Sequence, residues 1–427
     1  MRLVRSLTIL GCLNSAAFSI PLHGTPLHPA LILEGPGLSI AAAGAGMLGP
    51  TGRSRSLTVT VSGPVEKALL YWAGRDRPCP LEDGTCALPE TGVYKDQVIT
   101  FGGTSFTGIL IGNEVQPDTN AGPINNLGYA ADVTDAVRAR GTGRLTFTVA
   151  DSDAASNLAD LDGAGLLVIY TDPARPDPAR VIVYHGLDFA YGEDRTSGDS
   201  QVTDPFTFNH GAARASARQG DLALFVADAE TIGPDRVEVS RNPSLVNRLD
   251  GSSGASWDAE LVPVDIPAGA GSTTVQIFSE PIGRNPDSLL WVMAALRVPL
   301  PVPTGCAPEV WVTQTETVWF SEAGVRSTEK VQDVFREASR FGAVGAATLR
   351  TALRFRGGPG ALGAAKDLVQ AGTAALLNAG HPRIEYPLTK TQVVTRIDTA
   401  LRSQDTGLIL ATARGLAAAN GAVCPLH

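Results

Sequence analysis

The spacing of apolar residues changes near residue 300, and this change limits the architecture more than any other feature. Upstream, apolar and polar residues alternate in short runs separated by Gly, Pro, Asn and Asp, the pattern of half-buried β-strands. The clearest of these runs are Leu57–Val61, Val98–Phe101, Leu145–Val149 and Val275–Phe278. Downstream of the proline-rich segment 298–303, apolar residues recur at helical spacing. The sequence therefore predicts a mainly β protein that ends in a small α-helical bundle.

The β region is too long for one immunoglobulin-sized unit, so we expect two antiparallel β-sandwiches in tandem. The proline-rich crossing Asp172–Pro178 divides the region into residues 27–178 and 179–302. Some runs are apolar on both faces, which predicts central strands or strands in a contact between domains. These runs are Leu69–Trp72, with Tyr71 and Trp72 in the core, Leu166–Tyr170 and Leu289–Leu296. One large sandwich is the alternative.

Helix boundaries can be predicted within residues 303–427. Thr389 and Gln392 have the spacing of a capping box, which predicts that a helix begins there. Further helices are expected over residues 361–379 and 405–419, the second ending at Asn420 and Gly421. We therefore expect a bundle of four or five helices.

The cysteines downstream of the N-terminal leader fall into two pairs, Cys79 with Cys86 and Cys306 with Cys424. An even number of cysteines in an exported chain predicts disulfides. A disulfide that closes the long loop between Cys306 and Cys424 should stabilise the helical bundle by about 4–5 kcal/mol on the chain-entropy model. A metal site is disfavoured, because the sequence contains no C-x-x-C motif and no histidines at ligand-like spacing from the cysteines.

Residues 1–19 predict a secretory signal peptide. Arg2 and Arg5 precede an apolar stretch and the small residues of a cleavage site, which places the mature start near Ile20. The alternative is a lipoprotein in which Cys12 is lipidated. No later run reaches the roughly 18 apolar residues that a membrane-spanning helix requires. We therefore expect a secreted or cell-envelope protein, periplasmic or extracellular, without a transmembrane segment.

Charge and short motifs argue against several functions. The net charge of -9 disfavours a nucleic-acid partner, which would require a basic stripe. Gly44–Gly49 and Gly358–Gly363 match a dinucleotide fingerprint, but neither lies between a strand and a helix as that motif requires. Gly198–Ser200 is similar to a serine-hydrolase string, with His185 or His210 as a candidate base, but the glycine that should follow is missing.

An acidic cluster is the most informative candidate site. Asp151, Asp153, Asp160 and Asp162 flank one loop between two predicted strands. Carboxylates beside a glycine turn are oxygen ligands suited to Ca²⁺ outside the cell, although the spacing of an EF-hand is absent. The simpler interpretation is a solvated loop whose aspartates form Asx-turns. The same residues would supply the two carboxyl groups of an enzyme that acts on an extracellular polymer.

The β region also contains four strings that carry a family resemblance: Leu70–Gly74, Tyr129–Asp135, Gly163–Tyr170 and Val181–Gly186. Over roughly residues 55–300, the chain resembles an uncharacterised family of prokaryotic secreted and cell-surface β-sandwich proteins. This resemblance implies a structural or adhesive role in the envelope and supplies no catalytic residues.

The start of the C-terminal segment carries a second resemblance. Cys306–Trp311, followed by Trp319, is similar to a C-terminal module of other bacterial exported proteins, which usually opens with Cys-x-x-Gly-Tyr-Trp-Lys. Here Glu309 and Val310 replace Gly-Tyr, and Val312 replaces the lysine, so the role of that lysine cannot be transferred.

These observations together predict a binding protein without catalytic activity. Its expected partners are other envelope or surface components, including polysaccharide. The alternatives are an extracellular carbohydrate-active or other hydrolase and a Ca²⁺-dependent glycan-binding module.

Overall fold

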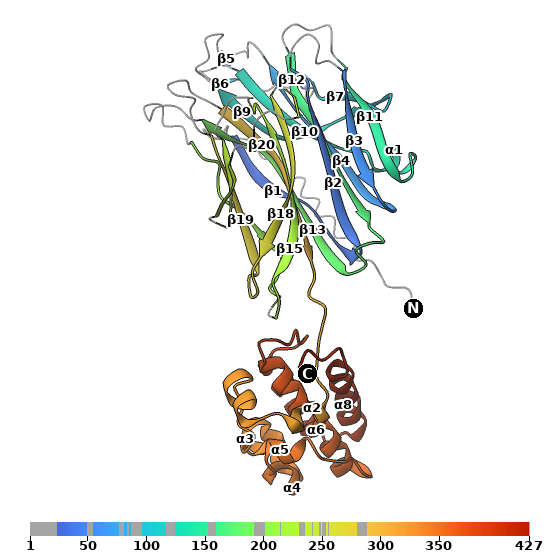
Figure 1. Cartoon of the computed structure of the whole chain (residues 1–427), viewed down its shortest axis with the longest axis vertical. Helices are drawn as coiled ribbons and strands as arrows, with labels where there is room; N and C mark the ends of the chain where they lie inside the picture. The colour runs from blue at the N-terminus through green and yellow to red at the C-terminus, as the bar shows by residue number, and fades with distance from the viewer. Residues whose placement is uncertain are drawn as a thin grey trace. The chain divides into compact units, whose positions relative to one another are not determined.

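The chain divides into two compact units (Figure 1). The β unit comprises Met1–Gly211, Arg218–Ile266 and Gly271–Leu300, and the helical unit comprises Ala212–Ala217, Pro267–Ala270 and Pro301–His427. The computed structural model describes residues 24–48, 54–76, 81–82, 85–86, 96–116, 124–152, 159–191, 201–213, 215–229, 235–240, 242–246, 249, 253–254, 256–279 and 288–426. The predicted signal peptide, residues 1–19, lies outside the described residues, as does Cys12.

The β unit is built from strands and one short helix, α1 (Thr134–Arg138). In chain order the strands are β1 (Gly24–Pro36), β2 (Leu38–Gly46), β3 (Ser54–Val61), β4 (Val65–Asp76), β5 (Leu81–Glu82), β6 (Thr85–Cys86), β7 (Val98–Phe101), β8 (Thr104–Thr107), β9 (Ile109–Gln116), β10 (Ile124–Asp132), β11 (Gly143–Asp151), β12 (Ala159–Thr171), β13 (Pro178–Tyr191), β14 (Phe206–Asn209), β15 (Arg218–Ala227), β16 (Arg236–Val239), β17 (Asn242–Val246), β18 (Trp257–Ile266), β19 (Ser272–Phe278) and β20 (Ser288–Pro299). The prediction of a mainly β region is confirmed.

These strands form four main sheets and a two-stranded hairpin, β5-β6, within the described residues. Sheet I has the order β3-β11-β7-β8, and sheet II has the order β2-β12-β4-β10-β9. Sheet III has the order β1-β13-β20-β15-β18, and sheet IV has the order β14-β19-β16-β17. The strand pairs of these sheets are antiparallel.

Sheet II is covered on both faces, because successive residues of a strand point to opposite sides. On β4, Leu70 and Trp72 belong to the core shared with sheet I, whereas Tyr71 and Ala73 belong to the core shared with sheet III. Both aromatic side chains are fully buried. The prediction that Leu69–Trp72 is a central strand with aromatic core residues is therefore confirmed.

Sheet III is covered on its other face by sheet IV. The ring of Phe206 on β14 lies 4.1 Å from the ring of Tyr184 on β13 and 6.4 Å from that of Trp291 on β20, measured between centroids. The run Leu289–Leu296 lies in β20, the middle strand of sheet III. Its apolar character on both faces follows from this position.

The crossing Asp172–Pro178 separates the sheets with one exception. Strands before it form sheets I and II, and strands after it form sheets III and IV, but β1 pairs with β13. This pairing runs from Pro36 opposite Pro178 to Gly24 opposite Asp188. The two halves of the β region therefore share sheet III and lie in one compact unit, and their organisation as tandem sandwiches stays a prediction.

Asp188 on β13 gives the β unit a predicted pH dependence. Its side chain is 2% exposed, and burial, together with the nearby charge of Asp204, raises its pKa to about 7 from 3.8. Between these values the folded chain keeps a proton that the unfolded chain releases, so stability should fall as pH rises from 4 to 7. Asp188→Asn should stabilise the β unit at pH 8 by about 3 kcal/mol. Urea unfolding at pH 5 and pH 8 measures the change in unfolding free energy between the two pH values. If this change is as large in Asp188→Asn as in the parent protein, the prediction is wrong.

The helical unit confirms the helices predicted over residues 361–379 and 405–419 and the helix predicted to begin at Thr389, but its described residues contain nine helical segments in place of the expected four or five. Its helices are α2 (Pro308–Thr313), the π-helix η1 (Val318–Glu322), α3 (Val331–Val334), the 3-10 helix η2 (Arg336–Phe341), α4 (Ala343–Ala346), α5 (Leu349–Ala352), α6 (Gly360–Gly380), α7 (Lys390–Ser403) and α8 (Thr406–Asn420). The Thr389 hydroxyl accepts a hydrogen bond from the Gln392 N–H and the Gln392 side chain accepts one from the Thr389 N–H, which is the predicted capping box. The Asp405 side chain caps α8.

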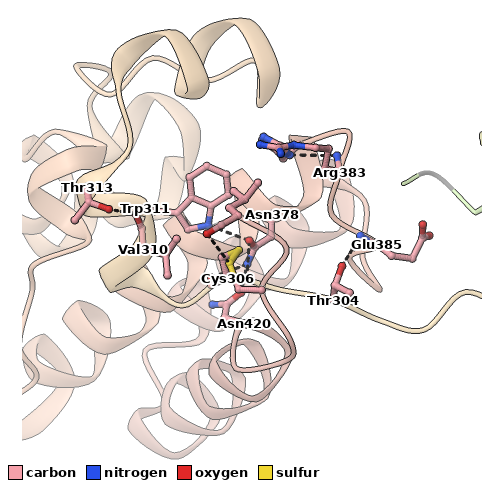
Figure 2. The surroundings of a disulfide bond; sticks show 12 residues. Thr304, Cys306, Val310, Trp311, Thr313, Asn378, Arg383, Glu385 and Asn420 are labelled. Atoms are coloured by element: carbon pink, nitrogen blue, oxygen red, sulfur yellow. Dashed lines mark hydrogen bonds between the residues drawn. A yellow bond between two sulfur atoms is a disulfide. The ribbon is translucent and has the colours of Figure 1, made fainter. Parts of the chain in front are cut away.

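The predicted disulfide between Cys306 and Cys424 is confirmed, and a buried amide network surrounds it (Figure 2). Asn378 on α6 accepts hydrogen bonds from the Cys306 N–H and from the Trp311 indole, and donates to the Cys306 carbonyl and to the Asn420 side chain. Tyr386 also donates to Asn420, over 2.8 Å. The network therefore links both ends of the helical unit to its longest helix.

Candidate functional site

A largely buried arginine forms ion pairs with aspartates of both sheet II and sheet III, beyond the apolar residues that pack between the two sheets. Arg75, near the end of β4, donates from Nε to Asp162 Oδ1 over 2.7 Å and from Nη2 to Asp228 Oδ1. Ser288, the first residue of β20, donates to Asp228 Oδ2 over 2.6 Å. Because Asp162 belongs to β12 of sheet II and Asp228 follows β15 of sheet III, the ion pairs connect the two sheets.

More polar side chains lie beside this arginine on the same face of sheet II. Asn126 on β10 is the cross-strand partner of Arg75, and Glu114 on β9 is the partner of Asn126. Directly opposed residues in antiparallel strands project from the same face. Asn126 donates to Glu114 Oε2 over 2.8 Å, and both residues are buried. We call Arg75, Glu114, Asn126, Asp162, Asp228 and Ser288 the Arg75 cluster.

An aromatic ring lies next to the cluster on sheet III. Tyr191, the last residue of β13, is the cross-strand partner of Ser288 and is half-buried. Its ring stacks on that of Phe189, with centroids 6.0 Å apart and planes 15° apart. The site therefore combines carboxylates, an amide and an aromatic ring at the ends of strands of two sheets.

Local backbone irregularities place the two aspartates. The pairing of β12 with β4 shifts register between Leu161 and Gly163, so Asp162 lies in a bulge, which re-aims a side chain. A Cβ atom at Gly163 would lie 2.6 Å from Trp257, so only glycine fits beside this bulge. Asp228 has a positive φ of 57°, a conformation that Asp and Asn adopt more readily than most residues.

Electrostatics keep the arginine charged. Burial by itself lowers the pKa of Arg75, but the charges of Asp162 and Asp228 and their hydrogen bonds outweigh it, so the pKa is raised. Its side chain is 13% exposed, and that of Asp162 is fully buried. One guanidinium thus lies among three carboxyl groups, counting Glu114. This arrangement suits ligands that donate hydrogen bonds, such as hydroxyl groups, better than anions.

Comparisons with known proteins do not identify the chain. No family model matches it, and no curated protein matches it. Two solved structures are similar to it at 9% identity, each covering 62% of this chain and 97% of its own. One is a peptide-N(4)-(N-acetyl-β-D-glucosaminyl) asparagine amidase, with a TM-score of 0.19, and the other is recombinant peptide:N-glycanase F, with a TM-score of 0.20. At these scores the likeness carries no argument about function.

The four predicted calcium ligands are placed to different degrees. Asp162 is ion-paired with Arg75, and Asp151 ends β11 in sheet I. Asp160 is the cross-strand partner of Arg75 on β12, and Asp153 lies outside the described residues. Among the residues that the structure describes, no group of three or more His, Cys, Asp or Glu side chains is arranged to hold a metal ion. The calcium site stays a prediction.

Cys86 ends strand β6, and Cys79 lies outside the described residues, so the disulfide between them stays a prediction. Gly44 lies within strand β2, where a Cβ atom would collide with Trp257 and Ala259, so this glycine permits close packing. His210 is buried and hydrogen-bonded to Thr273.

Gly360 begins helix α6 with a positive φ of 68°, so Gly358–Gly363 is a turn into that helix. Gly198–Ser200 lies outside the described residues. In the part of the chain that the structure describes, no helix combines the length and apolar character needed to cross a membrane.

Sequence reasoning missed most of the Arg75 cluster. The available signal was polar residues inside strand-like runs: Arg75 directly after the apolar run of β4, Glu114 in β9, and Asn126 in β10. Buried polar groups are informative because burying them costs free energy unless they are paired. Their convergence depends on strand register, which single runs do not reveal.

Proposed function

We propose that the protein is an exported binding protein of the cell envelope whose ligand is a hydroxyl-rich molecule, such as a polysaccharide chain. The observation that carries this proposal is the Arg75 cluster, which gathers charged and amide side chains beside the ring of Tyr191. Such groups can bind sugar hydroxyls, while an aromatic ring offers an apolar face to the ligand.

The proposed location is the envelope or the extracellular space, after removal of residues 1–19 as a signal peptide. The disulfide between Cys306 and Cys424 supports this location, because disulfides persist in oxidising compartments. We propose a tandem pair of sandwiches as the binding body, split near Pro178, and an adhesive or structural role in contact with other surface components.

Binding to polysaccharide tests the proposal. The full-length mature protein is run in affinity gels that contain soluble neutral, N-acetylated or acidic polysaccharides. We expect retardation by one class, reduced at least about 10-fold in affinity by Tyr191→Ala, since this change removes a ligand contact of roughly 1.4 kcal/mol or more. Thr146→Ala, on an exposed position of sheet I, is the matched control. Retardation that is equal in all variants would refute a site at the Arg75 cluster.

A hydrolase is the second candidate, because the cluster holds three carboxyl groups and glycosidases require two. Release of reducing ends from the retarding polysaccharide, lost in Asp228→Asn, the variant of the one cluster carboxylate with exposed side-chain surface, would favour the enzyme over the binding protein. Repeating the gels with a calcium chelator separates a third possibility, since loss of retardation would indicate Ca²⁺-dependent glycan binding through residues such as Asp151 and Asp160.

A further inference from the structure

Two histidines lie opposite each other on strands β1 and β13, at the edge of sheet III. Along the strands they are several residues away from the Arg75 cluster. His28 on β1 is the direct cross-strand partner of His185 on β13, and their ring centroids are 4.8 Å apart. His185 is in turn the cross-strand partner of Met293 on β20. Because directly opposed residues share a face, two imidazoles and a thioether form a row across three neighbouring strands.

The backbone around this row is irregular on both strands. The β1–β13 pairing shifts register between Thr25 and His28, and the β13–β20 pairing shifts between His185 and Asp188. Gly186 lies inside the second irregularity, where a Cβ atom would come within 2.7 Å of the Thr25 carbonyl. Bulges of this kind re-aim side chains and occur frequently next to functional sites.

The ring nitrogens of the two imidazoles have different surroundings. The His28 ring donates a hydrogen bond to the Pro26 carbonyl, which fixes the ring and leaves its other nitrogen as an acceptor. Nδ1 of His185 is buried and has no hydrogen-bond partner among the described residues.

A tyrosine of sheet II packs against the His185 ring. Tyr71 is fully buried, and its ring lies 5.9 Å from that of His185 and 5.9 Å from that of Phe225, the cross-strand partner of Met293. Within the described residues its hydroxyl has no hydrogen-bond partner. A buried hydroxyl without a partner is costly, so a group that satisfies it would stabilise this part of the core.

We propose that His28 and His185 bind a copper ion, with Met293 and Tyr71 as neighbouring donors. Two imidazoles on one metal ion, at a metal–nitrogen distance of about 2 Å, have ring centres about 5 Å apart, which agrees with the separation of this pair. Copper is the divalent first-row ion that nitrogen ligands bind most tightly, and a thioether favours its reduced form. Because His28 is exposed on the edge strand, a copper ion can reach the site from solvent.

Copper titration of the full-length mature protein tests this site. We expect one equivalent of Cu²⁺ by calorimetry, with an electron paramagnetic resonance spectrum that shows coupling to two nitrogen nuclei. His28→Ala and His185→Ala should each weaken binding more than about 10-fold and remove one nitrogen from the spectrum. Glu34→Gln, an exposed substitution on the same strand, is the control and should bind as the parent does.

Two measurements distinguish copper binding at this site from copper binding elsewhere in the protein. Met293→Leu should weaken binding of Cu⁺, measured by competition with a colorimetric chelator, while leaving Cu²⁺ binding within about 10-fold of the parent. Circular dichroism confirms that each variant is folded. If a folded His28→Ala variant keeps the affinity and the spectrum of the parent, the copper binds elsewhere and the proposal is wrong.

Discussion

Replacing both Cys306 and Cys424 by alanine is expected to lower the free energy of unfolding of the helical unit by about 4–5 kcal/mol. The two residues are 118 positions apart, so the disulfide removes much of the conformational entropy of the unfolded unit. Calorimetry of the full-length protein should show one transition moving to lower temperature, the one that belongs to the helical unit. The transition of the β unit should stay where it is.

A matched variant separates the disulfide from the packing around it. Asn378→Ala keeps the disulfide but removes the amide that bonds to Cys306 and Trp311, so it should destabilise the same transition by a smaller amount, about 1–3 kcal/mol. If the double alanine variant shifts the transition no more than this, the entropic account of the disulfide fails.

Arg75→Met is expected to destabilise the β unit by about 3–5 kcal/mol. The substitution removes the partner of Asp162 and Asp228 and leaves two carboxylates in a largely buried place. Urea unfolding followed by tryptophan fluorescence at pH 7 measures the loss.

The control is the triple variant Arg75→Met, Asp162→Asn, Asp228→Asn. It removes the uncompensated charges and should recover most of the lost stability, because buried ion pairs often contribute little beyond the cost of breaking them. Equal stability of the parent and the single variant would show that water reaches these carboxylates.

Local signals predicted much of the fold. The capping box at Thr389 is a short-range pattern, and helix α7 begins where it places the start. Alternation in Leu57–Val61 and Leu145–Val149 likewise predicted β3 and β11. Each of these elements is specified by residues within a few positions of one another, so a single sequence reveals it.

Features that depend on distant register could not be predicted in this way. The acidic pattern singled out Asp162, but Asp228, which binds the same Arg75 guanidinium, follows a strand of another sheet, and nothing near either aspartate indicates the other. The cross-strand pair of His28 and His185 was likewise invisible, because two single histidines in a sequence carry no information about pairing.

The position of β1 has a consequence for how the chain acquires its shape. This strand is made before the other strands of sheet III, yet its partner β13 follows only after the strands of sheets I and II. A chain that emerges N-terminus first therefore carries β1 unpaired during most of the synthesis of the β unit. Its prolines Pro26, Pro29 and Pro36 and its charged Glu34 disfavour pairing with strands of other chains, so we expect these residues to limit aggregation of the nascent protein in that interval.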